Sequence, residues 1–397
     1  MDTKLAEGVH WIGVIDWTVR DFHGYRTERG STYNAYLVQD EKTAVVDTVK
    51  APFAADLLDN IRTHVDPVNV DYVVCNHAEP DHAGSLPVLM KACPNAALVC
   101  DEKCRKALSM HHDTSGWTFK TVASGDRISL GGLTLSFVET PMVHWPESMF
   151  TYVPERKLLF SMDAFGQHYA SAHRFDDQEP LDVIMQEART YFANIVMLYD
   201  RPIARVMKKA SDLEMDIVAP SHGVIWRSHI DRILKAYTAW VEHRAAAKVV
   251  VLYDTMWTST EKMARAIVQG ALETDVDVKL HHVRESNLTV IATEILDTAT
   301  LAVGSPTLNK TLMPSVAAVL TYLKGLSPKG RAGFAFGSYG WAQGGAKAVH
   351  DYLEQMNVES LREPLQVQFV PGAEDLETCR QAGRELARKA LEISGEA

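Results

Sequence analysis

The sequence of 397 residues contains little cysteine, no long apolar run and no excess of positive charge. Its five cysteines are scattered and form no Cys-x-x-Cys pair, which argues against a disulfide framework and against a thiolate zinc or iron–sulfur site. No apolar stretch approaches the roughly 18 residues of a membrane helix, and no signal-peptide pattern opens the chain. We therefore expect a protein of the reducing cytoplasm that does not span a membrane.

The charge balance and the glycine pattern exclude further classes. The formal net charge is −11, which argues against nucleic acid as a general partner. A Gly-x-Gly-x-x-Gly fingerprint for dinucleotides is missing as well. The apolar share of 46% and the charged share of 23% are those of an ordinary globular protein, and the length predicts about two or three domains.

A cluster of potential metal ligands follows the apolar stretch 73–75. Its members are His77, Glu79, Asp81 and His82. Pro80 prevents this segment from continuing as a ladder strand or an uninterrupted helix, so a turning loop can aim the four side chains into one cavity. Imidazole and carboxylate groups together suit first-row metals. Three further candidates end apolar runs downstream, and they disfavour a polar loop with chance histidines. These three are His144, Asp163 and His222.

The order of these residues resembles the ligand motif of proteins with the metallo-β-lactamase fold. The usual motif there is His-x-His-x-Asp-His, followed by a His, a bridging Asp and a last His. Glu79 stands in the place of the second His. A second carboxylate adds negative charge and hard oxygen ligation, which favours iron over the zinc of the hydrolases. With this exchange the chain resembles the flavodiiron proteins, or A-type flavoproteins, over essentially its whole length.

The resemblance implies roles for individual residues. One iron takes His77, Glu79 and His144, the other takes Asp81, His82 and His222, and Asp163 bridges them. In some relatives the histidine at the position of His82 is turned away and replaced by water, so both arrangements stay open here. His23 and Tyr25 are candidates to line the metal cavity, although a plain surface loop accounts for them equally well. Tyr191 is a further catalytic candidate, and Phe192 stands where relatives usually carry a second tyrosine.

The elements expected for the first domain, residues 1–247, fit an α/β fold of the metallo-β-lactamase-like αββα sandwich type. We expect strands at 9–15, 33–38, 43–48, 71–75, 97–100, 128–130, 133–139 and 157–162. We expect helices at 53–65, 85–91, 102–111, 181–197 and 229–244. The segment 21–25 is expected to be a loop.

The sequence changes character after residue 247, and residues 248–397 are expected to form a flavodoxin-like doubly wound parallel sheet. Its first unit is the continuous apolar strand 249–253, a loop rich in hydroxyl groups and the helix 260–273. Further strands are expected at 276–281, 300–304, 331–336 and 364–370, with helices at 342–356 and from 374. Ligands bind at the carboxyl ends of the strands in such sheets.

A flavin mononucleotide accounts for the three loops at these strand ends. Hydroxyl and backbone N–H groups at a helix N-terminus hold a phosphate, and a tryptophan gives the flavin ring an aromatic contact. The candidate FMN-binding residues are Thr255, Met256, Trp257, Thr258, Ser259, Thr260, Ser305, Pro306, Thr307, Leu308, Asn309, Ser338, Tyr339, Gly340 and Trp341. Singly, each tryptophan could be core packing and each hydroxyl a helix cap. Relatives often carry Asn and Gly where this chain has Lys310 and Thr311, and the lysine either stabilises reduced flavin or is simply solvated.

The resemblance implies an oxidoreductase of an anaerobe that detoxifies O₂, nitric oxide or both. FMN takes electrons from a separate rubredoxin-like donor and passes them to the diiron site, which reduces O₂ to water or nitric oxide to nitrous oxide. It also implies a head-to-tail homodimer, with Trp145 near the flavin of the partner chain. The alternative is a metal-dependent hydrolase with a fused flavodoxin domain, against which Glu79 and the flavin both count. A pure electron carrier is disfavoured by the seven-ligand set.

Overall fold

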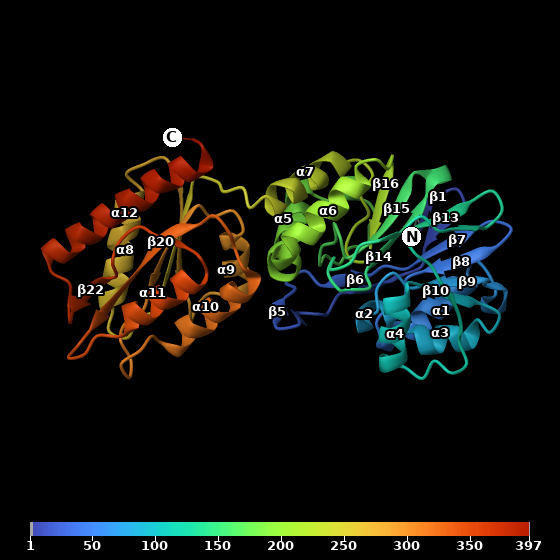
Figure 1. Cartoon of the computed structure of the whole chain (residues 1–397), viewed down its shortest axis with the longest axis horizontal. Helices are drawn as coiled ribbons and strands as arrows, with labels where there is room; N and C mark the ends of the chain where they lie inside the picture. Colours follow the sequence, from blue (N-terminus) through green and yellow to red (C-terminus); the bar gives the residue numbers. More distant parts are fainter. Residues whose placement is uncertain (1–2, 397) are drawn as a thin grey trace. The chain divides into compact units, whose positions relative to one another are not determined.

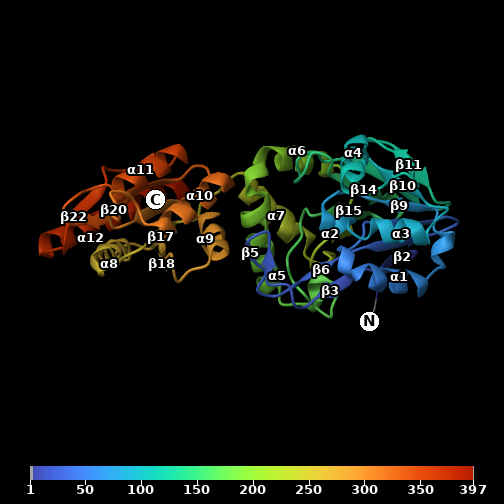
Figure 2. The ribbon, with the colours of Figure 1, turned by 90° about the horizontal axis from the view of Figure 1, so that it is seen from below.

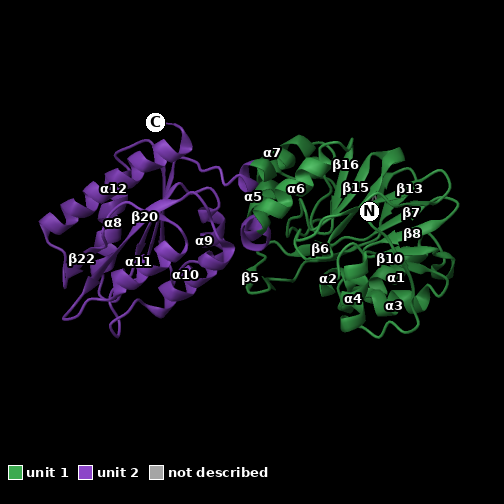
Figure 3. Ribbon diagram, in the orientation of Figure 1, with its two compact units in different colours: residues 1–191, 199–238 green, residues 192–198, 239–397 purple. Residues whose placement is uncertain are grey.

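The computed structural model describes residues 3–396, and the chain divides into two compact units (Figure 1, Figure 3). Unit 1 comprises Met1–Tyr191 and Tyr199–Thr238, and unit 2 comprises Phe192–Leu198 and Ala239–Ala397. Within the described range, no helix has the length and apolar character that a membrane span requires.

Unit 1 is a sandwich of two sheets between layers of helices, so the predicted αββα architecture is confirmed (Figure 1, Figure 2). The first sheet contains, in spatial order, β1 (Lys4–Ala6), β2 (Val9–Trp11), β7 (Tyr36–Gln39), β8 (Thr43–Val46), β9 (Tyr72–Val74), β10 (Ala97–Cys100) and β11 (Thr118–Thr121). The second contains β12 (Arg127–Ser129), β13 (Thr134–Glu139), β14 (Met149–Val153), β15 (Leu158–Met162) and β16 (Ile217–Pro220).

The helices of unit 1 cover the outer faces of both sheets. On the first sheet lie α1 (Ala54–Arg62), α2 (Pro80–Ala83), α3 (Leu86–Ala92) and α4 (Glu102–His111), and on the second lie α5 (Leu181–Tyr191), α6 (Asp200–Ala210) and α7 (Ile230–Val241). The core lies between the sheets, where Tyr36 of β7 packs on Phe160 of β15 with ring centroids 4.8 Å apart. Because both faces of the sheets are covered, β8 and β15 are buried at every residue, as in parallel sheets.

Two predicted elements of unit 1 were wrong in detail. The strand expected at 9–15 is split into β2 and β3 (Val14–Asp16), and β3 pairs with β6 (Ser31–Tyr33) in a separate small sheet. Gly13 lies at the break, and a Cβ on it would lie 2.3 Å from the Tyr33 carbonyl oxygen, so only glycine permits this close approach. The loop expected at 21–25 is a hairpin of β4 (Asp21–Phe22) and β5 (Tyr25–Arg26), in which His23 and Gly24 both have positive φ.

The helix expected at 181–197 also differs from the structure. Its α-helical part, α5, ends at Tyr191, and residues 192–196 form a π-helical turn that belongs to unit 2. In unit 2 the side chain of Asn194 lies between α9 (Leu288–Ile295) and α10 (Pro314–Leu326), and its amide oxygen accepts a hydrogen bond from the Tyr322 hydroxyl at 2.8 Å. The prediction also missed several elements, among them α6, α9, α10, β11 and β14.

Unit 2 is a parallel sheet with helices on both faces, which confirms the predicted doubly wound class (Figure 1, Figure 2). Its strands are β18 (Asp277–His282), β17 (Lys248–Tyr253), β19 (Thr300–Gly304) and β20 (Ala332–Tyr339), with β21 (Glu359–Ser360) and β22 (Leu365–Gln368) both beside β20. One face carries α8 (Ser259–Ala271) and α12 (Ala373–Ser394), and the other carries α9, α10 and α11 (Gly345–Gln355). The strand order reverses between β17 and β19, which is where such sheets bind ligands.

Candidate metal centre and flavin site

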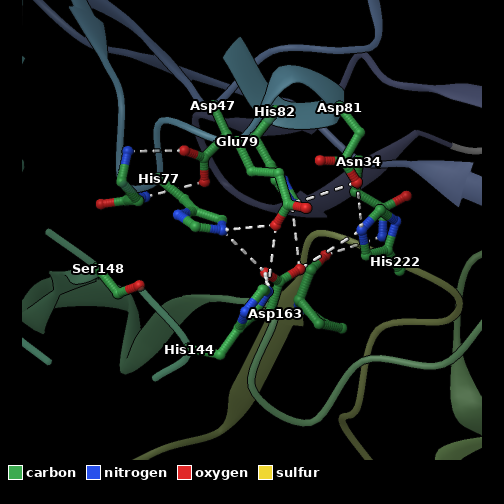
Figure 4. A network of polar contacts seen from close by, with 12 residues as sticks. Asn34, Asp47, His77, Glu79, Asp81, His82, His144, Ser148, Asp163 and His222 are labelled. Atoms are coloured by element: carbon green, nitrogen blue, oxygen red, sulfur yellow. Dashed lines mark hydrogen bonds and ion pairs between the residues drawn. The ribbon is translucent and has the colours of Figure 1, made fainter. Parts of the chain in front are cut away.

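The seven predicted metal ligands lie together in unit 1 as two adjacent clusters (Figure 4). The first contains His77, Glu79, His144 and Asp163, and the second contains Asp81, His82 and His222. Within each cluster the ligand atoms lie within 4.8 Å of one another. Asp163 lies between the clusters, with Oδ2 3.2 Å from Nε2 of His144 and Oδ1 3.1 Å from Nε2 of His82.

These side chains come from loops at one end of the two sheets. His77 and Glu79 follow β9, Asp81 and His82 lie in the single turn of α2, and His144, Asp163 and His222 lie close to the ends of β13, β15 and β16. Pro80 begins α2 rather than only interrupting a strand, which is the helix position that proline favours. The loop is anchored from behind, because Asn76 donates through its backbone N–H and its side-chain amide to the two carboxylate oxygens of buried Asp47, at 2.8 and 2.9 Å.

The hydrogen bonds of the imidazoles show how well the site fits cations. Nδ1 of His222 lies 2.7 Å from the Thr32 carbonyl, which can only accept, so this nitrogen carries a proton. Nε2 of His222 faces the Asp81 carboxylate, 3.2 Å away. A cation between these two atoms, whether proton or metal, would hold them together.

The spacing of the ligand atoms also fits two first-row metals. Metal bonds of roughly 2.0–2.2 Å place neighbouring ligand atoms about 3 Å apart. The nitrogen–oxygen distances within the site run from 3.1 to 3.5 Å. In addition, Oδ1 of buried Asp81 has no hydrogen-bond donor within the described part of the chain. Residues and spacing therefore fit the diiron group.

Electrostatics keep the carboxylates of this site ionised. Burial opposes charge on every group, but the surrounding histidines outweigh it and hold the pKa of Asp163 well below its usual range. Conversely, burial lowers the pKa of His144, but contacts with Asp163 and Glu79 raise it to about 10. The ionised carboxylates therefore favour a positive charge in the cavity, whether this is a proton on a histidine or a bound metal ion.

Of the three further catalytic candidates, His23 and Tyr191 lie beside metal ligands, and Tyr25 lies one residue farther away, behind His168. His23 lies with Nε2 2.9 Å from Oε1 of Glu79, although its side chain is 64% exposed. The Tyr25 hydroxyl lies 2.8 Å from Nε2 of His168, and the His168 ring lies 5.0 Å from the rings of both His222 and Tyr191. Burial and the negative charge of Asp163 raise the pKa of Tyr191 well above 10, so its hydroxyl stays protonated.

The sequence prediction missed four residues that support the site, namely Glu147, Thr32, Ser31 and His168. Glu147 accepts from Nδ1 of His77 at 2.9 Å, Thr32 orients His222, and Ser31 and Tyr25 hold the two ring nitrogens of His168. Only Glu147 had a local signal, because it follows His144 by three residues at the end of the same loop.

The predicted flavin loops meet at the carboxyl edge of the sheet in unit 2. The Thr260 hydroxyl lies 2.9 Å from the Ser338 hydroxyl, which joins the first loop to the third. Thr307 N–H donates to the Ser338 carbonyl at 2.9 Å, which joins the second to the third. Ser305 has a role inside its own loop, since its hydroxyl accepts from the Met313 N–H at 2.9 Å.

The first loop provides unpaired polar groups where a phosphate is expected. The Thr255 hydroxyl is buried without a hydrogen-bond partner among the described residues. Thr258 precedes α8 with positive φ and its side chain does not cap the helix, so the first-turn N–H groups can bind an anion. Asp254, not predicted, fixes this loop by accepting from the Thr255 N–H at 2.6 Å and from Nε of Arg284 at 2.8 Å.

The aromatic residues of the flavin loops lie on the surface. Trp257 is 88% exposed and Trp341 is 94% exposed, and Met256 at 42% lies beside Trp257 in the sequence. Neither tryptophan packs in the core, so that alternative is wrong. In the second loop, Leu308 and Thr311 exchange two backbone hydrogen bonds of 2.9 Å around Asn309 and Lys310, both with positive φ. This is the tight turn that usually requires Asn or Gly, and Lys310 occupies it instead.

Comparison with known proteins agrees with both sites. Residues 32–223 match the ODP family beta lactamase, and residues 251–383 match flavodoxin. The chain is 44% identical to the nitric oxide reductase of Moorella thermoacetica, covering 97% of this chain and 98% of that one. The rubredoxin oxygen:oxidoreductase of Desulfovibrio gigas superposes with a TM-score of 0.96 at 38% identity and covers 99% of both chains. The flavodiiron protein of Giardia intestinalis has a TM-score of 0.97 at 36% identity, with 100% and 98% covered.

The chain belongs to the flavodiiron protein family. A flavodiiron protein is an oxidoreductase that carries FMN and a non-haem diiron centre, and both predicted cofactors are confirmed at this level. The flavin loops count against the alternative of a hydrolase, because hydrolysis does not use a flavin.

The exposure of Trp341 gives a prediction for the flavodiiron protein. We expect Trp341→Ala to weaken FMN binding about five- to tenfold, since an aromatic stacking contact contributes about 1 kcal/mol. Flavin released from the full-length protein by denaturation is expected to be FMN, because the first loop serves one monophosphate. Fluorescence titration and chromatography of the released flavin check both points. Trp17→Ala is the matched control, as Trp17 is 54% exposed in unit 1. Recovery of FAD, or unchanged affinity in the variant, would contradict this prediction.

Proposed function

We propose that this flavodiiron protein reduces O₂ to water, nitric oxide to nitrous oxide, or both. The observation that carries the proposal is the position of Asp163, which presents one carboxylate oxygen to each cluster. Two irons held by these clusters would supply the chemistry for binding and reducing a diatomic gas. The names of the relatives in Moorella thermoacetica and Desulfovibrio gigas point to the same two gases.

The ligand assignment is part of this proposal. One iron would be held by His77, Glu79 and His144, the other by Asp81, His82 and His222, and Asp163 would be shared by both. The arrangement in which His82 is a ligand is favoured by its place in the second cluster, where Nε2 lies 3.1 Å from Asp163 and 3.5 Å from Asp81. We place the diiron domain in residues 1–247 and the FMN domain in residues 248–397.

The surrounding side chains suggest how the chain assists the reaction. When bound, FMN supplies electrons and the iron pair binds and reduces the gas. Both reductions consume protons, and the protonated Tyr191 hydroxyl is buried beside Asp163 as a donor. Ser31, His168 and Tyr25 form a hydrogen-bonded row, with 2.8 Å from each hydroxyl to a ring nitrogen. Burial and the neighbouring His222 hold the pKa of His168 well below its usual range, so the neutral ring can relay a proton along this row. His23 orients Glu79 through Oε1.

The partners follow from the same chemistry. We propose a rubredoxin-like protein as the electron donor and a head-to-tail homodimer in which Trp145 lies near the partner chain's FMN. Trp145 is partly exposed and lies edge-on to His77 at 5.1 Å, so it is a suitable contact between a flavin and the iron ligands. A cytoplasmic location is proposed because all five cysteines are buried and unpaired.

Turnover with the two gases, side by side, tests the proposal. The iron- and FMN-loaded protein is mixed with reduced rubredoxin and either O₂ or nitric oxide, and gas consumption is followed with electrodes. We expect consumption of at least one gas well above that of rubredoxin alone, and the ratio of the two rates gives the preference. Consumption of neither gas would refute the proposed function.

A further inference from the structure

The two metal positions have matched ligands but different surroundings. Each cluster contributes two histidines and one carboxylate of its own, and Asp163 is shared. The ligand sets therefore carry the same formal charge. The two clusters differ in the hydrogen-bond partner of one histidine each. Nδ1 of His77 contacts the Glu147 carboxylate at 2.9 Å, whereas Nδ1 of His222 contacts the neutral Thr32 carbonyl at 2.7 Å.

Glu147 is a buried charge in a fixed position. It is 3% exposed, and its Oε1 accepts both from His77 and, at 3.2 Å, from the Ala78 N–H. The segment that carries it is held to the ligand loop, because the Met149 N–H donates to the Asn76 carbonyl at 3.0 Å. Glu147 is therefore a positioning residue that acts through His77.

The charge of Glu147 has an electronic consequence. A carboxylate that accepts the distal N–H of a metal-bound imidazole raises the basicity of that ligand, while a neutral carbonyl does so less. A more basic ligand stabilises the higher oxidation state of iron. His23, which contacts Glu79 on the same side, is largely exposed, so solvent screens any charge it carries.

We propose that Glu147 makes the two irons unequal, so that the iron at His77, Glu79 and His144 is the harder one to reduce. This inference rests on the diiron centre of the proposed function and concerns the order of its electron transfers. During reduction the iron at Asp81, His82 and His222 accepts its electron first, and the iron beside His77 accepts its electron at the lower potential.

The test is a redox titration of the iron-loaded full chain, followed by the EPR signal of the half-reduced state. In the wild type we expect two separate one-electron steps. In Glu147→Gln the lower-potential step is expected to shift upward while the upper step stays, which narrows the separation and lowers the maximal EPR signal. Glu139→Gln is the matched control, because it removes a carboxylate that contacts Ser124 and no histidine.

A second variant, Glu147→Asp, keeps the inference testable if Glu147→Gln fails to bind two irons. Glu147→Asp keeps the charge but withdraws it by one methylene, so an intermediate separation is expected. If both reduction potentials equal those of the wild type in every Glu147 variant that binds two irons, the inference is overturned. Such a result would leave the proposed function intact as long as the wild type still consumes gas, whereas a wild type that takes up no iron would refute the proposed function itself.

Discussion

Replacing Asp163 with alanine is expected to lower the iron content from about two per chain to one or fewer and to reduce gas turnover by about 100-fold or more. The carboxylate contacts histidines of both clusters, with Oδ2 3.4 Å from Nε2 of His77 and Oδ1 3.4 Å from Nε2 of His222. Its removal leaves four histidines without their shared anion. Elemental analysis and gas electrodes on the same preparation measure both effects.

The control for this prediction is Asp59→Ala, which removes an exposed carboxylate from α1 of the same unit. Circular dichroism of both variants establishes that they fold. We expect Asp59→Ala to match the wild type in iron content and turnover. Full iron occupancy with normal turnover in Asp163→Ala would show that the bridge is assigned to the wrong residue.

Mixing two inactive variants is expected to restore activity if the flavin of one chain serves the iron of its partner. His77→Ala removes an iron ligand, and Ser259→Asp places a negative charge at the first residue of α8, which a helix N-terminus tolerates but a bound phosphate does not. Each variant alone should be nearly inactive. After subunit exchange, half of the dimers are mixed and each has one complete pair, so about a quarter of wild-type turnover is expected.

The exchange experiment has a clear opposite result. If electrons move from FMN to iron within one chain, neither variant holds an intact pair and no activity returns on mixing. Flavin and iron contents of each variant, measured before mixing, establish that each lacks only its intended cofactor. A mixture of either variant with itself is the matched control.

Much of the metal centre was predictable because its residues mark the ends of strands. Four ligands lie within six residues after β9, and His144, Asp163 and His222 each follow an apolar run, so the positions could be read from the chain in order. The supporting contacts could not be read in this way. Glu147 follows His144 closely in the sequence, but its partner His77 is 70 residues away, and Thr32 lies 190 residues from His222, so no local pattern joins either pair.

The errors in the elements have similar physical causes. The strand at 9–15 breaks at Gly13 because another segment, at Tyr33, comes too close for a side chain, which is a tertiary effect. The helical pattern continues past Tyr191, yet the chain leaves the α-helix there, and Asn194 accepts a hydrogen bond from Tyr322 within unit 2. By contrast, α10 carries a local signal in the sequence, since Pro314 begins it and Val316, Val319, Leu320 and Leu323 form its buried stripe.

Metal and flavin analysis of one purified preparation tests the central claim most directly. The account predicts about two irons and about one FMN per chain, with little zinc, because the site combines carboxylates with imidazoles and the second unit has a monophosphate loop. Zinc in place of iron, together with the absence of a flavin spectrum, would contradict the account and favour a metal-dependent hydrolase instead.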